Sequence, residues 1–411
     1  MDFAFTEEQQ MIRDTAESFL AEVSTSEAIR VAMASEQGYD QALWQRICTD
    51  LYWQAIHIPE AYGGMGLGYV ELIAMLEQMG RYLLCSPFYS TVCLGANALI
   101  VAGDEAQKAE YLPKICEGMT ATLAYTGASA AKFGGDWGAN AIDATYTREG
   151  GQFRLTGDYH YVIDGASAEL LIVAAREAGS SGNDGVTLFV VPANSAGIER
   201  RFTPSMDQTR KLGQLIFDGV ILSEAAVMGE QGCAWSALES ILDLANIALA
   251  AEQMGGSQQL LDMTVEYTKE RTQFNRQIAS FQAIKHKAAD MMTSVEVARS
   301  GVYYAACVAQ EFLQSAISTA SDDDIIELSL VNELPEAASV AKSYCSDAYF
   351  ANAGEAMQMH GGVGFTWEYD VHLYFKRAKA SEHFLGNGAW HRERIATLLL
   401  DQSIVNESEA G

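Results

Sequence analysis

The sequence predicts an α+β fold in which a helical part, a β part and a second helical part follow one another. Two observations lead to this prediction. The apolar residues change from helical to β-type spacing and then back again along the chain. The length of 411 residues also exceeds what one hydrophobic core normally serves. We place the three domains at residues 1–120, 121–229 and 230–411.

The N-terminal domain is predicted to be all helical. Its first helix should begin after Thr6, because Gln9 stands three positions further on and completes a capping-box pattern. Apolar residues at helical spacing predict one buried face, made of Met11, Ile12, Ala16, Phe19, Leu20 and Val23. Further helices are expected at residues 40–53, 69–80 and 104–117.

The middle domain is predicted to be an antiparallel β domain. Short β-type runs at residues 153–162, 169–175 and 186–191 alternate with clusters of Gly, Asn, Asp and Ser. After residue 232 the pattern becomes long and helical again, and we expect helices at residues 236–272, 283–312 and 333–360.

The composition excludes some partners and indicates a compartment. A formal charge of -28 argues against nucleic acid, since phosphate backbones are bound by broad basic surfaces. No apolar run reaches the ~18 residues of a membrane span, and the acidic, helical N-terminal stretch does not resemble a secretion signal. The seven cysteines include no Cys-x-x-Cys pair, and the acidic run at residues 322–324 favours a solvated connection. We therefore expect a cytoplasmic protein without a metal site.

Basic residues are scarce, so their one dense cluster is informative. Arg271 and Arg276 lie close in sequence to Lys269 and Lys285. Arginine offers a planar fork of donors to a phosphate, and adjacent glycines let a phosphate approach backbone N–H groups. The glycines of residues 63–68 lack the spacing of a dinucleotide loop and indicate a tight interhelical turn.

Three stretches together resemble the acyl-CoA dehydrogenase family. They are residues 58–67 (IPEAYGGMGL) with a helix that ends EQMGR at 77–81, residues 267–286 (YTKERTQFNRQI and FQAIKH), and residues 358–368 (QMHGGVGFTWE). The resemblance implies that the C-terminal domain is a four-helix bundle through which subunits pair into homo- or heterotetramers. It also implies FAD as cofactor, an acyl-CoA substrate and an electron-transfer flavoprotein as partner.

The resemblance also implies which residues bind the cofactor. The second and third stretches would hold the nucleotide end of an FAD in a neighbouring subunit, through Arg271, Gln273, Phe274, Ile278, Phe281, Gln282, Gln358, Met359, Gly361 and Gly362. In the middle domain, Thr126 and Tyr161 match positions near the flavin ring, whereas Ile163 replaces a polar residue.

The catalytic residue is unknown, because both usual positions of the family's catalytic Glu are changed. The matching residues are Leu385 and Ala245, and neither can accept a proton. A missing general base typically costs about 10²- to 10⁴-fold in rate. Asp243, Glu252 and Glu382 are nearby in sequence, and Glu252 is a weak candidate for a displaced base because it lies about two helical turns beyond Ala245.

Residues 364–374 and 207–210 are similar to bacterial members that pair unlike subunits to oxidise bulky, steroid-type acyl-CoA esters. Three hypotheses follow. The chain is the FAD-supporting partner of a heteromeric dehydrogenase, a self-sufficient homotetramer with a displaced base, or a flavin enzyme of other chemistry on the same fold.

Overall fold

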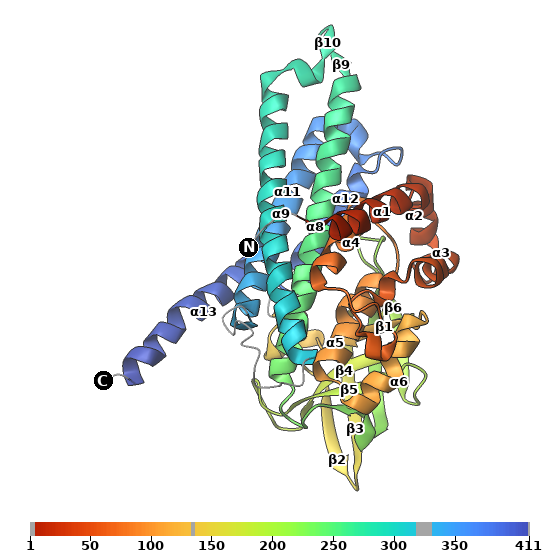
Figure 1. Cartoon of the computed structure of the whole chain (residues 1–411), viewed down its shortest axis with the longest axis vertical. Coiled ribbons are helices and arrows are strands. Elements are labelled where there is room, and N and C mark those ends of the chain that lie inside the picture. Colours follow the sequence, from red (N-terminus) through yellow and green to blue (C-terminus); the bar gives the residue numbers. More distant parts are fainter. Residues whose placement is uncertain (1–4, 133–135, 318–330, 410–411) are drawn as a thin grey trace.

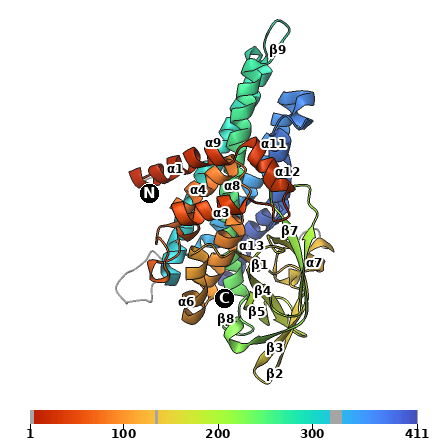
Figure 2. The same cartoon turned by 90° about the vertical axis from the view of Figure 1, so that its right-hand side faces the viewer.

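The computed structural model describes residues 5–132, 136–317 and 331–409, and it has the three predicted parts (Figure 1). Long helices stand side by side and form the tallest part of the molecule. The sheet lies at one end of these helices, and a short hairpin lies at their other end in both views (Figures 1 and 2). The acidic run at residues 322–324 lies outside the described residues.

The N-terminal part consists of helices joined by tight turns. The α-helices are α1 (Glu7–Val23), α2 (Ser26–Ala34), α3 (Gln41–Arg46), α4 (Tyr69–Arg81), α5 (Asn97–Ala102) and α6 (Glu105–Cys116). The predicted capping box is present, because the side chain of Thr6 accepts from the backbone of Gln9 and the Gln9 side chain accepts in return. Gly63 and Gly66 have positive φ angles of 85° and 63°, as a tight turn requires.

Two predictions for this part are wrong in detail. Met11 is 64% exposed, whereas Ala16 and Leu20 of the same predicted face are buried. The reason is that Met11 stands five residues before Ala16, about 140° around the helix, so it lies off the face that the core covers. The helix expected at residues 40–53 leaves the α conformation after Arg46, passes through a π-helical turn at Ile47–Leu51, and ends at Tyr52 with φ 55°.

The middle part is one eight-stranded sheet. Its strands are β1 (Ala121–Ala124), β2 (Thr145–Glu149), β3 (Gln152–Ile163), β4 (Leu170–Glu177), β5 (Val186–Pro192), β6 (Ile198–Thr203), β7 (Leu212–Ser223) and β8 (Val227–Met228). The spatial order is β6-β7-β3-β2-β4-β5-β8, with β1 beside β4. Pairing is largely antiparallel as expected, and β4 also pairs in parallel with β1 and β2. A short helix, α7 (Ala128–Lys132), follows β1.

The C-terminal part is helical. It contains α8 (Trp235–Glu270), the hairpin β9 (Thr272–Gln273) and β10 (Arg276–Gln277), α9 (Gln282–Ile317), α11 (Leu334–His360), α12 (Val371–His383) and α13 (Gly388–Glu409). Every residue from 241 to 257 of α8 is buried, so α8 is the central helix of the molecule. Among the described residues, no helix is both long and apolar enough for a membrane crossing.

Two glycines set the distance between α4 and α8. A Cβ at Gly255 would lie 1.8 Å from the carbonyl oxygen of Glu77, and a Cβ at Gly80 would lie 2.0 Å from that of Glu252. Real Cβ atoms do not approach oxygen so closely, so only glycine permits this contact. The buried stretch of α8 that faces the sheet is therefore held directly against the N-terminal helices.

Candidate active site

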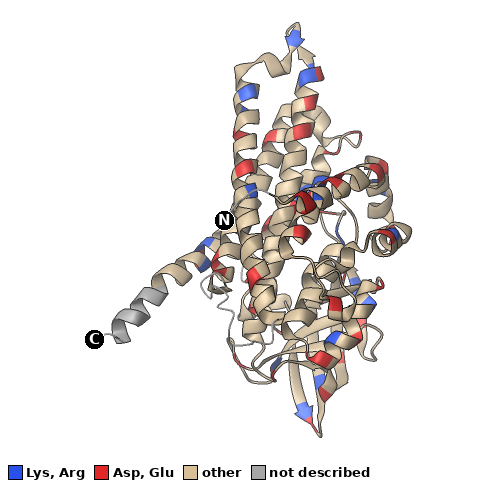
Figure 3. Cartoon of the chain, in the orientation of Figure 1, with Lys and Arg blue, Asp and Glu red and all other residues tan. Residues whose placement is uncertain are grey.

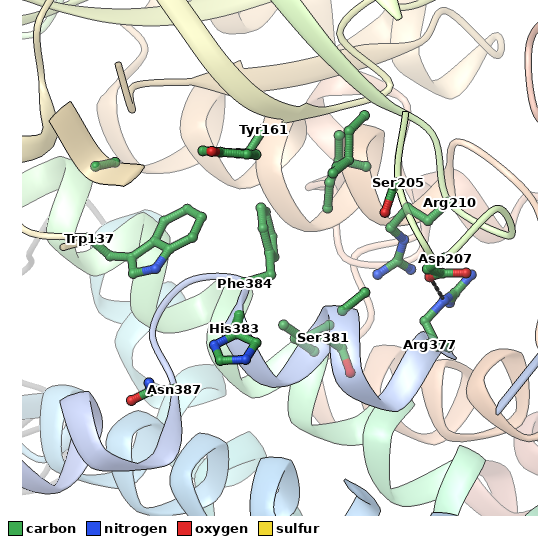
Figure 4. Close-up of a pocket in the computed structure, with 15 residues that line it drawn as sticks. Trp137, Tyr161, Ser205, Asp207, Arg210, Arg377, Ser381, His383, Phe384 and Asn387 are labelled. Atoms are coloured by element: carbon green, nitrogen blue, oxygen red, sulfur yellow. Dashed lines mark hydrogen bonds and ion pairs between the residues drawn. The ribbon is translucent and has the colours of Figure 1, made fainter. Parts of the chain in front are cut away.

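A cavity of about 270 Å³ lies between the sheet and the helices (Figure 4). This volume is close to the lower end of the roughly 300–1000 Å³ typical of small-molecule sites. The sheet contributes residues of β3, and the β6–β7 connection contributes a charged segment. Helices α8 and α12 and the loop after α12 complete the wall. One end of the cavity is aromatic and the other is charged.

At the aromatic end, Trp137 packs edge to face on Phe384 with ring centroids 5.4 Å apart, and Tyr161 lies nearby (Figure 4). Tyr161 has a left-handed backbone (φ 58°), which redirects its side chain from the strand pattern. The Thr126 hydroxyl donates to the carbonyl of His160 over 2.9 Å, so the β1 end is tied to β3. Thr126 and Tyr161, which the resemblance implied for the flavin ring, are thus brought together.

The charged end consists of two buried ion pairs. Arg377 of α12 donates through Nε to Asp207 over 2.7 Å, and through Nη2 to the hydroxyl of Thr209 over 2.6 Å. Arg210 donates through Nη2 to both carboxylate oxygens of Glu252, over 2.8 and 2.7 Å. These pairs join the β6–β7 connection to α12 and α8. Their partners lie 170 and 42 residues apart in sequence, so sequence spacing gave no sign of the pairing.

Both positions of the usual base lie in the protein interior. Leu385 is 3% exposed and has φ 59°, and its carbonyl oxygen is 2.9 Å from Nε2 of His391. Ala245 is 0% exposed, and its carbonyl accepts from the Tyr89 hydroxyl over 2.9 Å. Neither position offers a group that titrates.

The three carboxylates weighed as replacements are each paired. Glu252 has both oxygens on Arg210, so it is not free to accept a substrate proton in this arrangement. Glu382 pairs with Lys379 over 2.8 Å. Asp243 likewise has both oxygens on Arg394, and burial raises the pKa of Asp243 to about 6 against the opposing hydrogen bond and charge of that arginine.

A second cavity of about 150 Å³ adjoins Leu385 and contains Asp243 in its wall. Aromatic side chains make up much of the remaining wall, namely Tyr125, Trp137, Trp235 and Trp390. Trp137 lines both cavities and so stands between them. Of the three carboxylates, Asp243 is the one that faces space next to the usual base position.

Sequence reasoning missed a buried lysine that holds the loop after α12. Lys342 of α11 is 0% exposed. Its Nζ lies 2.8 Å from the Ser346 hydroxyl and 2.8–3.2 Å from three carbonyl oxygens, those of Ser381, Glu382 and Gly386, and these four acceptors share its three N–H donors. Burial lowers the pKa of Lys342 to about 7. This lysine therefore satisfies the backbone on both sides of Leu385.

The residues predicted for the FAD nucleotide end lie at the far end of the helices. Arg271, Gln273, Phe274 and Gln282 are exposed at the β9–β10 hairpin, and Phe274 is 86% exposed. Ile278 and Phe281 are half-buried, and the Arg276 guanidinium lies 3.8 Å from the centre of the Phe281 ring. Figure 3 shows Lys and Arg at this tip and many Asp and Glu along the helices below it.

The third stretch meets the second at this tip. Tyr267 of α8 stacks on His360 with ring centroids 4.3 Å apart. Gln358, Gly361 and Gly362 are exposed next to this stack, whereas the Met359 side chain is buried. Gly361 has φ 62°, and a Cβ at either glycine would meet no atom within 4 Å. The tip thus has guanidinium donors and open backbone, which fit a phosphate group.

Within one chain the two predicted sets of cofactor residues do not meet. The hairpin lies at the opposite end of the long helices from the sheet and its cavity (Figures 1 and 2). A ligand that touches both sets must therefore bridge two subunits.

Comparison with known proteins agrees with this architecture. Residues 6–119 match the model of the acyl-CoA dehydrogenase N-terminal domain, and residues 233–400 match that of the C-terminal domain. The chain belongs to the acyl-CoA dehydrogenase family. It is 31% identical over 381 residues to acyl-CoA dehydrogenase IpdE2 of Mycolicibacterium smegmatis. The aligned part covers 93% of this chain and 95% of the relative.

Two solved structures are also similar. One is a variant of the Tcur3481-Tcur3483 steroid ACAD, with 28% identity, a TM-score of 0.82, and coverage of 97% of this chain and 99% of the other. The second is the ChsE4-ChsE5 complex from Mycobacterium tuberculosis, with 26% identity, a TM-score of 0.82 and the same coverage of both chains.

Members of this family are FAD-dependent oxidoreductases of acyl-CoA thioesters. The residues of this chain fit the cofactor unequally. The exposed Arg271 beside the hairpin and the open backbone of Gly361 and Gly362 after α11 fit its phosphates. The chain's own cavity keeps the aromatic Tyr161 but has the apolar Ile163 where a polar contact to the ring is usual.

Proposed function

We propose that this chain is the FAD-supporting subunit of a heteromeric acyl-CoA dehydrogenase, and that an unlike subunit supplies the catalytic carboxylate. One observation carries the proposal. Both base positions, Leu385 and Ala245, are buried and cannot titrate, while the exposed hairpin tip keeps its phosphate-binding residue types.

In the proposed assembly the hairpin tip serves the partner's site. Arg271 would hold the FAD pyrophosphate, the exposed Phe274 would pack on the nucleotide, and the open backbone at Gly361 and Gly362 would approach it. The bound flavin accepts a hydride from the acyl chain, and an electron-transfer flavoprotein is the expected acceptor. The similarity to ChsE4-ChsE5 and to a steroid ACAD supports a paired assembly and a bulky acyl-CoA substrate.

A reconstitution experiment tests the partner role. The chain is purified alone with FAD, and again with a second family member from its source that carries a Glu at either base position. Each sample is assayed with short-chain, long-chain and steroid-type acyl-CoA esters and a dye acceptor. We expect turnover from the pair and turnover lower by at least about 10²-fold from the lone chain. Equal turnover from both samples would overturn the proposal.

A substitution at the hairpin tip tests the cofactor role. Arg271→Ala should weaken FAD retention by about 1.5–3 kcal/mol, the usual contribution of a charge-assisted hydrogen bond. Arg148→Ala is the matched control, because this arginine lies on β2 of the sheet domain and is 48% exposed. Equal flavin content in both variants of the assembly would contradict a phosphate contact at Arg271.

Asp243 favours a second candidate function, a self-sufficient dehydrogenase with a displaced base. Asp243 lines the cavity next to Leu385, and burial raises its pKa to about 6, nearer to neutrality than an ordinary Asp. Both of its oxygens accept from Arg394, so it would have to release that arginine before it could take a substrate proton. If the lone chain turns over acyl-CoA, Asp243→Asn should abolish that activity while the flavin content stays constant. If activity instead persists in Asp243→Asn and disappears in Glu252→Gln, the displaced base is Glu252.

A further inference from the structure

The charged end of the cavity holds hydrogen-bond donors that no protein group uses. Arg210 contacts Glu252 through Nη2, and its Nε and Nη1 have no acceptor within the described part of the chain. Arg377 uses Nε and Nη2 on Asp207 and Thr209, and its Nη1 is likewise without an acceptor there. Both guanidiniums line the cavity (Figure 4).

Both donors are held in fixed positions. The Arg210 guanidinium lies 4.7 Å from the centre of the Tyr89 ring, and its bidentate contact with Glu252 restricts it further. Arg377 is 5% exposed and is fixed between Asp207 and Thr209. Donors that are already oriented lose little entropy when a ligand binds, so they favour selective recognition.

The charge of the cluster indicates what kind of acceptor it would take. Each guanidinium already has a carboxylate within 2.8 Å, so the four groups together carry no net charge. A further carboxylate from a ligand would be buried without a compensating cation, in a chain whose formal charge is -28. A neutral oxygen can accept these hydrogen bonds without that cost.

We infer that this end of the cavity is a donor subsite for a neutral oxygen acceptor, such as a ring ketone, on the acyl group of a bulky acyl-CoA. The inference rests on the proposed acyl-CoA function and requires that the acyl group enter this chain's own cavity, as it would in the self-sufficient form with Asp243 as base. The subsite adjoins Phe384 and Leu249, so a group bound there lies close to the loop and helix that carry the two usual base positions. Arg210 and Arg377 would then select among substrates of similar carbon skeleton.

Three thioesters of matched skeleton test this with the FAD-loaded protein, alone and in its reconstituted assembly. They are cyclohexanecarbonyl-CoA and its 4-oxo and 4-carboxy derivatives, with binding measured by calorimetry. We expect the 4-oxo ester to bind about tenfold or more tightly than the parent, from one hydrogen bond to a charged donor. The 4-carboxy ester should bind no better than the parent. If none of the esters binds, the proposed function fails; if all three bind equally, only the subsite inference fails.

A double substitution separates recognition from a structural role. Arg210→Met with Glu252→Met removes both charges of the pair and every side-chain N–H donor at position 210, so that no buried charge is left unpaired and no amide replaces the guanidinium. Arg299→Met with Glu77→Met is the matched control, a partly buried pair between α9 and α4 that does not line the cavity. We expect the first variant to lose the preference for the 4-oxo ester and the control to keep it. If the first variant keeps the preference, the inference is overturned, and the ion pairs serve only to hold the sheet domain against the helices.

Discussion

Replacing Lys342 with Met should loosen the loop that carries Leu385. The substitution preserves the length of the apolar stem but removes the donor to the carbonyls of Ser381, Glu382 and Gly386. Each buried acceptor left without a donor costs about 1–3 kcal/mol. Part of this loss is offset, because the variant no longer has to bury a charged ammonium group. We therefore expect a net destabilisation of roughly 3 kcal/mol.

The pH dependence of stability tests this prediction a second, independent way. The pKa of Lys342 is lowered to about 7 in the folded chain, whereas an unfolded lysine titrates near 10.4. Between these values the unfolded chain binds more protons, so this group's contribution to stability rises with pH. The stability deficit of Lys342→Met should therefore be larger at pH 9 than at pH 7, by up to roughly 3 kcal/mol over the two units.

Urea unfolding followed by tryptophan fluorescence measures the stability, and hydrogen exchange of residues 381–391 locates the change. Lys379→Met is the control, because its side chain is 36% exposed and pairs with Glu382 at the surface. Such a pair contributes about 1 kcal/mol or less. The reasoning is refuted if both variants are equally stable, or if the deficit of Lys342→Met is the same at pH 7 and pH 9.

Three further outcomes are expected. Gly255→Ala should destabilise the fold by about 1–3 kcal/mol or more in urea unfolding, because the new Cβ would lie 1.8 Å from the Glu77 carbonyl oxygen. The control is Gly301→Ala on α9, whose Cβ would meet no atom within 4 Å, and this variant should be as stable as the parent or more stable. His57, whose pKa burial lowers to about 4, resists protonation when folded, so stability should fall on the order of 3 kcal/mol from pH 6.5 to 4. His57→Gln, which can still donate to Asn97, should flatten that slope in pH-dependent unfolding, and an unchanged slope would exclude His57 as its source. Sedimentation should show at least a dimer at micromolar concentration, and a monomer would remove the interface on which the cofactor assignment depends.

The sequence by itself determined the order of the three parts and many of the local signals. The capping box of Thr6 and Gln9 and the turn at Gly63 and Gly66 depend on residues within a few positions of each other, so their patterns can be read directly. The family resemblance likewise rested on short contiguous stretches. The same stretches predict that Leu385 stands where a Glu is usual.

Only the tertiary structure decided how these pieces act together. Periodicity predicted a buried face for α1, but only the structure shows how wide that face is and that Met11, about 140° around the helix from Ala16, lies outside it. The sequence offers Glu252 as a candidate base, and only the fold shows that Arg210 donates to both of its oxygens. Lys342 gave no signal at all, since its three carbonyl acceptors lie in the last turn of α12 and the loop after it, about forty residues away. Long-range contacts of this kind depend on how whole elements pack, and no local pattern in the chain encodes them.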